Sequence, residues 1–123
     1  MTGRDESTMA INFQDIGETN LRRIALSDRL DVSGAQAVET KFAALAASAQ
    51  RRVVVDLTAV SFLASMGIRL LIVNAKAQQN RGGRLVLHVG DNTAVAKVLE
   101  TAGISSLIPT FTDAAEAERA ALA

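Results

Sequence analysis

Ser65 is the side chain of this sequence that is best placed for chemistry. It follows an apolar, strand-like run at residues 53–57 and a short segment at 58–64, and a helical pattern begins near Met66. This order predicts a hydroxyl at the start of a helix, where free backbone N–H groups and the positive end of the helix dipole favour a phosphate or another anion. The alternative is structural, because serine is a favoured helix N-cap, worth about 1 kcal/mol relative to alanine.

Other side chains give weaker indications of catalysis. His88 is the only histidine and lies in a strand-like run at 85–89, where histidine is more often structural than catalytic. The serine-hydrolase pattern Gly-x-Ser-x-Gly is absent, so nucleophilic catalysis by Ser65 is not predicted. Asp56 follows the apolar run, so it is either a base or magnesium ligand, or an acceptor for N–H groups of the following turn. Asp91 and Asn92 are predicted helix caps.

Metal and cofactor sites are not predicted. The chain has no cysteine and a single histidine, which excludes disulfides, thiolate zinc sites and cysteine nucleophiles. Gly82 and Gly83 lie between a helical pattern and a strand pattern, whereas a phosphate-binding loop needs the order strand, glycine-rich turn, helix. We therefore expect no metal and no other cofactor.

Composition and charge favour a single domain and disfavour binding to nucleic acid. The 123 residues are 49% hydrophobic, which is enough for one buried core. Thirteen basic and thirteen acidic residues cancel, and tryptophan and tyrosine are absent, so direct nucleic-acid binding is not expected. The most apolar stretch, residues 53–73, contains Asp56 and Arg69, and each charge would cost about 2.5–3.5 kcal/mol inside a bilayer. Because the N-terminus also lacks a secretory h-region, we expect a cytoplasmic protein without membrane insertion.

The hydrophobic pattern alternates between strands and helices. A period of two on either side of a turn at 17–20 predicts an opening antiparallel hairpin, and each later strand is followed by a helical stripe. Ser33 is the predicted N-cap of the first helix, and Pro109 predicts an edge position for the last strand. The predicted strands are residues 11–16, 21–26, 51–57, 84–89 and 106–111, and helices are predicted to begin after Ser33 and near residues 66, 91 and 112.

This order of elements defines the fold class. Strands separated by helices imply parallel pairs with right-handed crossovers, while the hairpin adds an antiparallel edge. We predict an α/β fold with a mixed, mainly parallel sheet of about five strands and about four helices packed mainly on one side. Residues 1–9 are polar and are predicted to be a flexible N-terminus, and residues 10–123 are predicted to form the domain.

Residues 56–68, together with the run Arg29-Leu30-Asp31, resemble the STAS domain family, and most of all its stand-alone bacterial anti-sigma factor antagonists. The resemblance covers about residues 10–120, and the predicted strand order agrees with the STAS fold. In that family a strand ends in a turn with a phenylalanine, then an aspartate, a serine or threonine, and a glycine two places after the hydroxyl. The corresponding residues here are Phe62, Ala64, Ser65 and Gly67, so the sequence departs from the pattern at the aspartate.

The resemblance implies a binding protein, itself not an enzyme, that regulates sigma-factor-dependent transcription by partner switching. The unmodified antagonist binds an anti-sigma factor that is also a serine kinase, and so releases the sigma factor. The kinase phosphorylates the antagonist with ATP, the complex breaks, and a serine phosphatase resets the cycle. Carried over, Ser65 is the phosphoacceptor, and the expected partner-binding surface comprises Ser61, Phe62, Ala64, Ser65, Met66 and Arg69.

Ala64 leaves a second class of function open. Either the usual acid is dispensable, or this chain is phosphorylated poorly, or it works as an unmodified binder. The alternative is a non-phosphorylated STAS subunit of another assembly, such as a lipid-transport complex or a stress-signalling scaffold. In that case Ser65 serves only as a helix cap.

Overall fold

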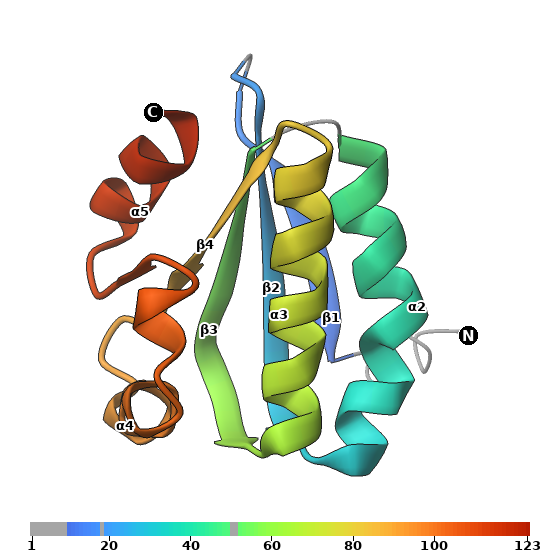
Figure 1. Cartoon of the computed structure of the whole chain (residues 1–123), viewed down its shortest axis with the longest axis vertical. Helices are drawn as coiled ribbons and strands as arrows, with labels where there is room; N and C mark the ends of the chain where they lie inside the picture. Colours follow the sequence, from blue (N-terminus) through green and yellow to red (C-terminus); the bar gives the residue numbers. More distant parts are fainter. Residues whose placement is uncertain (1–9, 18, 50–51) are drawn as a thin grey trace.

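The protein, described by a computed structural model over residues 10–17, 19–49 and 52–123, contains a five-stranded sheet with the order β1-β2-β3-β4-β5 (Figure 1). The strands β1 and β2 are antiparallel, and each later neighbour is parallel, as predicted. The predicted flexible segment 1–9 lies outside the described residues. The strands are β1 Ile11–Asp15, β2 Leu21–Leu30, β3 Arg52–Leu63, β4 Arg84–His88 and β5 Thr110–Phe111.

Helices cover the two faces of the sheet unequally. Helices α2 and α3 lie side by side on one face (Figure 1), and Val95 and Leu99 of α4 join the same large core. Helix α5 packs on the opposite face, where its Ala117 and Ala121 form a small second cluster with residues of β2, β3 and β4. The α/β class and the packing mainly on one side are therefore confirmed. The helices are α2 Val32–Ala49, α3 Ser65–Asn80, α4 Thr93–Thr101 and α5 Ala114–Leu122, with a 3₁₀ turn η1 at Ile104–Ser106.

The strand β3 forms the centre of the fold because it is apolar on both faces. Val53 and Val55 are fully buried in the large core, and Val54 between them is fully buried in the small cluster. Such a continuous apolar run is typical of a strand that is covered on both sides. No helix in the described part of the chain is long and apolar enough to cross a membrane.

The strands β2 and β3 are longer than the sequence predicted. Both were expected to end near residues 26 and 57, but they continue to Leu30 and Leu63, which pair with each other. Two register shifts interrupt this second half, and Asp28 adopts a left-handed φ of 64° there. The irregular pairing replaces the period of two with burial at every third residue of β3, which explains why the pattern did not indicate a strand.

The last strand is shorter than predicted, although its edge position is confirmed. Only Thr110–Phe111 pairs with β4, and part of the predicted strand is the 3₁₀ turn η1. Pro109 has no N–H group to donate, so the ladder cannot extend beyond it. The pairing of β5 with β4 therefore begins at Thr110.

The helix caps correct one prediction and confirm another. Asp31, not Ser33, caps α2, because its Oδ1 accepts the N–H of Gly34 at 2.9 Å. Asn92 caps α4 as predicted, and its side chain accepts the N–H of Val95 at 3.2 Å. A carboxylate placed directly before the helix thus takes the capping role that the following serine was expected to have.

Candidate functional site

The candidate site lies where β2 and β3 end and α2 and α3 begin. The two strands run in parallel, and Arg29 of β2 is the register partner of Phe62 of β3. The N–H of Ala64 donates to the carbonyl of Leu30 at 3.1 Å, which ties the start of α3 to the end of β2. The sequence around Ser65 is thus held against the sequence around Arg29 by backbone contacts.

Ser65 is the first residue of α3 and does not cap it. The N-cap position belongs to Ala64, which has extended backbone angles (φ −113°, ψ 179°) and no side-chain acceptor. The Ser65 side chain is exposed, and its hydroxyl makes no hydrogen bond with any described residue. The capping interpretation of Ser65 is therefore wrong, and the hydroxyl is free to react.

The N-terminus of α3 is open as well as exposed. Its first intrahelical bond runs from the N–H of Ile68 to the carbonyl of Ala64 at 3.0 Å. The N–H groups of Ser65, Met66 and Gly67 have no acceptor among the described residues. Together with the helix dipole, these donors make the position favourable for a negative charge.

Gly67 determines how closely α3 approaches the strands. A Cβ at this position would lie 2.7 Å from Leu63 Cδ1 and 2.9 Å from the carbonyl oxygen of Leu30. Only glycine fits without displacing backbone, so the glycine two places after the serine has a packing role. It brings the first turn of α3 onto the ends of β2 and β3, and thereby fixes where Ser65 emerges.

Arg29 and Phe62 form an exposed aromatic and cationic pair beside Ser65. The guanidinium carbon of Arg29 lies 4.4 Å from the ring centroid of Phe62, whose relative exposure is 41%. Arg29 Nε also donates to Asp31 Oδ2 at 3.2 Å. The N–H of Gly34, followed by the Arg29 hydrogen bond, lowers the pKa of Asp31, so this carboxylate is ionised at neutral pH. Sequence reasoning used Arg29 and Asp31 only as family markers and missed their place in the site.

The outer side of α3 extends the exposed apolar surface. Met66 and Val73 lie two turns apart on this helix, are 37% and 53% exposed, and have Arg69 between them. They border a groove of about 130 Å³ between α3 and α2, whose far side includes Glu39. These exposed side chains of α3, together with Ser65 at the start of the helix and the Arg29–Phe62 pair at the ends of β2 and β3, are called here the α3 surface: Arg29, Phe62, Ser65, Met66, Arg69 and Val73.

Two predicted members of the binding surface are placed differently. Ala64 is half-buried and contributes mainly its backbone. Ser61 is exposed, but it lines a separate open hollow with Thr58, Asp91 and Asn92. Because β3 is still a strand at this point, Ser61 and Phe62 point to different sides.

Asp56 and His88 belong to a polar cluster on the face covered by α5. Arg23 Nη1 lies 3.1 Å from Asp56 Oδ2 and 3.3 Å from His88 Nδ1, and its Nη2 donates to Glu118 at 3.1 Å. Asp56 also accepts the N–H and hydroxyl of Thr58 at 2.9 and 2.6 Å, although it lies within β3 and not after it. The acceptor role predicted for Asp56 is confirmed by these bonds, but the turn that was predicted to follow it is wrong, because Thr58 also lies within β3.

This polar cluster has a structural role. Burial opposes the ionisation of Asp56, but the two Thr58 hydrogen bonds and the charges of Arg23 and His88 outweigh it and lower its pKa. The arginine joins β2, β3, β4 and α5 through its partners. Across the described residues, no three histidine, cysteine or acidic side chains are grouped so that they could hold a metal ion.

Comparisons with known proteins agree with this architecture. An anti-sigma factor antagonist from Mycobacterium paratuberculosis superposes with a TM-score of 0.77 at 20% identity, covering 93% of this chain and 96% of that one. The unphosphorylated anti-sigma factor antagonist SpoIIAA gives 0.62 at 20% identity, covering 89% and 94%. Phosphorylated SpoIIAA of Bacillus, described as a cell fate determinant, gives 0.64 at 18% identity, covering 90% and 99%.

One of the two sequence comparisons identifies a family. A search of curated protein sequences gives no significant match. The STAS domain family, in contrast, matches residues 14–117, which include β2 to β5 and the whole α3 surface. The chain belongs to the STAS domain family.

Proposed function

We propose that this protein is an anti-sigma factor antagonist that binds an anti-sigma factor serine kinase through the α3 surface and is switched off by phosphorylation of Ser65. The observation that carries the proposal is the free, exposed hydroxyl of Ser65 at an uncapped helix start. The similar solved structures include an antagonist in both unphosphorylated and phosphorylated forms. Binding would release a sigma factor, and a serine phosphatase would restore the binding form.

The composition of the α3 surface suits a protein partner. Phe62, Met66 and Val73 offer apolar contact area, and Arg29 and Arg69 offer donors beside them. Interfaces concentrate their binding energy in a few residues of this kind, with aromatic residues, methionine and arginine enriched. Ser65 lies between Phe62 and Met66, so a modification there changes the middle of the contact.

The switch arises in the complex and leaves the fold of the antagonist intact. A phosphate adds about −1.5 to −2 charges at neutral pH. On the free protein it would meet the open N–H groups of Ser65, Met66 and Gly67, which stabilise negative charge. In the complex the same charge would be desolvated against a packed surface, which weakens binding.

Ala64 is compatible with this role. An aspartate at the N-cap would accept the N–H groups of the first turn and would place a negative charge beside the phosphate. Here those donors stay free for the phosphate itself. The alternative function, a non-phosphorylated STAS subunit, gave Ser65 the role of a cap, and Ala64 occupies the cap position instead.

The decisive experiment combines partner capture with site mapping. The protein is used to capture partners from native lysate with and without ATP, and the captured kinase is then incubated with purified antagonist and ATP. We expect mass spectrometry to find phosphate on Ser65 and the Ser65→Ala variant to remain in the complex when ATP is added. Phosphate only on Ser61 or elsewhere, with ATP-insensitive binding of the wild type, would contradict the proposal.

A further inference from the structure

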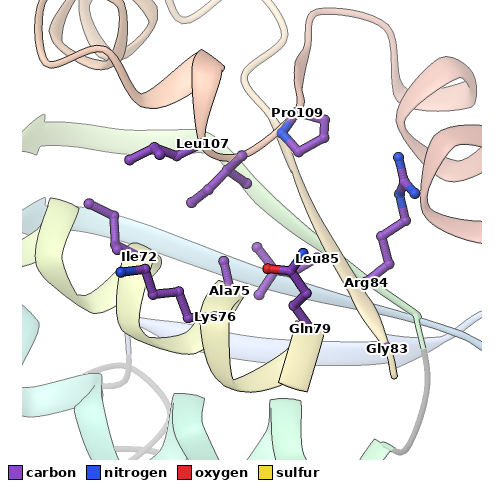
Figure 2. A pocket seen from close by; sticks show the side chains of 10 residues that line it. Ile72, Ala75, Lys76, Gln79, Gly83, Arg84, Leu85, Leu107 and Pro109 are labelled. Carbon is purple, nitrogen blue, oxygen red and sulfur yellow. The ribbon is translucent and has the colours of Figure 1, made fainter. Parts of the chain in front are cut away.

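A second concave site lies at the other end of α3, far along the helix from Ser65. It is a hollow of about 330 Å³ between the C-terminal half of α3, the start of β4 and the segment that leads into β5. Figure 2 shows Lys76 and Gln79 on the α3 side and Leu107 and Pro109 on the other side, with Leu85 of β4 between them. None of these residues belongs to the α3 surface.

The backbone beside this hollow has an incomplete sheet edge. The N–H of Leu87 donates to the carbonyl of Pro109 at 2.9 Å, and that of Val89 donates to Phe111 at 2.9 Å. Peptide groups of alternate residues point the same way along a strand, so the N–H and C=O of Leu85 face the same edge. The matching donor for the Leu85 carbonyl would come from position 109, which is a proline.

The chain before Pro109 does not complete the edge either. It leaves β4 and enters η1, where the N–H of Ile108 donates to Ile104 at 2.8 Å. Among the described residues, no backbone hydrogen bond joins Leu85 to the segment before β5. The N–H and C=O of Leu85, a residue that is 4% exposed, therefore have no backbone partner on this edge among the described residues, and they face the side on which an added strand would bond.

The side chains around the edge are apolar and cationic. Ile72, Ala75 and Leu85 provide an apolar lining, and Leu107 on the rim is 62% exposed. Lys76 and Arg84 also line the hollow, and neither forms an ion pair with any described residue. The lining contains two cations and no carboxylate, which is complementary to an acidic occupant.

We propose that this hollow binds an extended peptide segment of a partner protein, in which an apolar residue is adjacent to acidic ones. The segment adds to the free edge of β4 by exchanging backbone hydrogen bonds with Leu85, as in other cases of strand addition. Its apolar side chain lies against Ile72, Ala75 and Leu107, and its acidic side chains face Lys76 and Arg84. The protein would then hold two partners at once, because the α3 surface stays free.

The test starts from a displayed library of random twelve-residue peptides. The library is selected on the full chain and counter-selected on the Lys76→Glu/Arg84→Glu double variant, whose changed side chains are exposed. We expect wild-type-specific peptides that combine acidic and apolar residues, and NMR shifts of the Leu85 and Leu107 amides when they bind. Absence of such peptides, or shifts confined to other regions, would overturn the proposal.

Matched variants separate strand addition from other binding. Affinity should fall at least tenfold in the Lys76→Glu/Arg84→Glu and Leu107→Ser proteins, and for a peptide N-methylated at its central residues. It should not change in Lys41→Glu, an exposed lysine of α2, or in Ser65→Asp.

Equal binding of the N-methylated peptide would exclude strand addition. Saturable binding of decanoate without any selected peptide would identify a site for small acids and would contradict the peptide proposal.

Discussion

The helices α2 and α3 begin in closely similar ways and differ in one feature. Each follows one strand of the parallel pair β2 and β3, and each has a glycine at its third position, Gly34 or Gly67. At α2 the carboxylate of Asp31 accepts the Gly34 N–H, whereas at α3 the corresponding residue is Ala64. The start of α2 therefore has a side-chain cap, and the start of α3 has none.

The other helices show that the open start is unusual in this protein. Asn92 caps α4, and Asp113 caps α5 by accepting the N–H of Glu116 at 2.9 Å. Among the α-helices of the described chain, α3 is thus the one whose start has no side-chain cap. A missing cap costs about 1 kcal/mol, and such local losses are expected at functional sites. The uncapped start of α3 is therefore consistent with the function proposed for Ser65.

The largest expected effect concerns the two glycines. A Cβ at Gly34 would clash with the carbonyl of Arg29, and at Gly67 it would lie 2.9 Å from the carbonyl of Leu30. Overpacking against backbone costs about 1–3 kcal/mol, so Gly34→Ala and Gly67→Ala should both destabilise the protein in urea unfolding. Gly34→Ala should lose more stability than Gly67→Ala, because its Cβ would lie closer to a backbone carbonyl.

Ser33→Ala is the control for this pair of variants. Ser33 is exposed, lies next to Gly34 and does not cap the helix, so its replacement should change the stability by no more than about 0.5 kcal/mol. A stabilising effect of alanine at Gly67, as expected for an ordinary helix position, would show that the close contact with β2 is absent in solution.

The second prediction concerns the open helix start itself. Ser65→Asp places a negative charge where the first-turn N–H groups are free, so the melting temperature should stay within a few degrees of wild type. Affinity for the anti-sigma partner should nevertheless fall at least tenfold, or about 1.4 kcal/mol, because the charge is desolvated in the complex. Calorimetry on the purified pair measures the affinity, and circular dichroism measures the melting temperature.

Ser65→Ala is the matched control for the charge. It should bind like wild type, and it should also retain wild-type stability, because Ser65 makes no hydrogen bond with any described residue. Wild-type affinity in Ser65→Asp would contradict the electrostatic switch, and loss of binding through unfolding would contradict the claim that the helix start accepts an anion.

The sequence predicted the fold well because its central elements follow simple periods. The apolar run of β3 and the stripes of α2 and α3 gave the order and class of the elements, and Pro109 gave the edge. The second halves of β2 and β3 were missed, since their pairing depends on register shifts between segments about 30 residues apart. Propensity alone cannot show such a contact.

The site was predicted less completely than the fold. Ser65 was found through its place between a strand and a helix, but the sequence could not show whether it caps the helix or is its first residue. The stacking of Arg29 on Phe62 depends on the missed pairing of the two strands. Local sequence can therefore point to a candidate residue, while tertiary pairing determines its surroundings.

The third prediction concerns the N-cap position of α3. Ala64→Asp supplies α3 with the cap that α2 already has, because Ala64 has the extended backbone of an N-cap residue. The variant should gain about 0.5–1 kcal/mol of stability in urea unfolding. It should also slow the phosphorylation of Ser65 in a kinase assay if the free N–H groups help to hold the incoming phosphate. A loss of stability would show that the start of α3 cannot accept a side-chain cap.

The smallest effect concerns how the stability contributed by the Asp31 cap of α2 depends on pH. The Gly34 N–H and Arg29 lower the pKa of Asp31 below its ordinary value of 3.8, so the folded state prefers the ionised form. This stabilisation is complete above the unfolded pKa and is lost as the pH falls through the lower folded pKa. Asp31→Ala should therefore melt below wild type at pH 7, and the difference should shrink as the pH falls below about 4. Asp56, whose pKa is also lowered, is present in both proteins, so the difference between the two melting curves isolates Asp31.

In the Ala64→Asp background a second acid-sensitive contribution of the same sign should appear, now from α3. A difference between wild type and Asp31→Ala that is constant from pH 7 to pH 3 would mean that the carboxylate does not cap α2, and the contrast between the two helix starts would be lost.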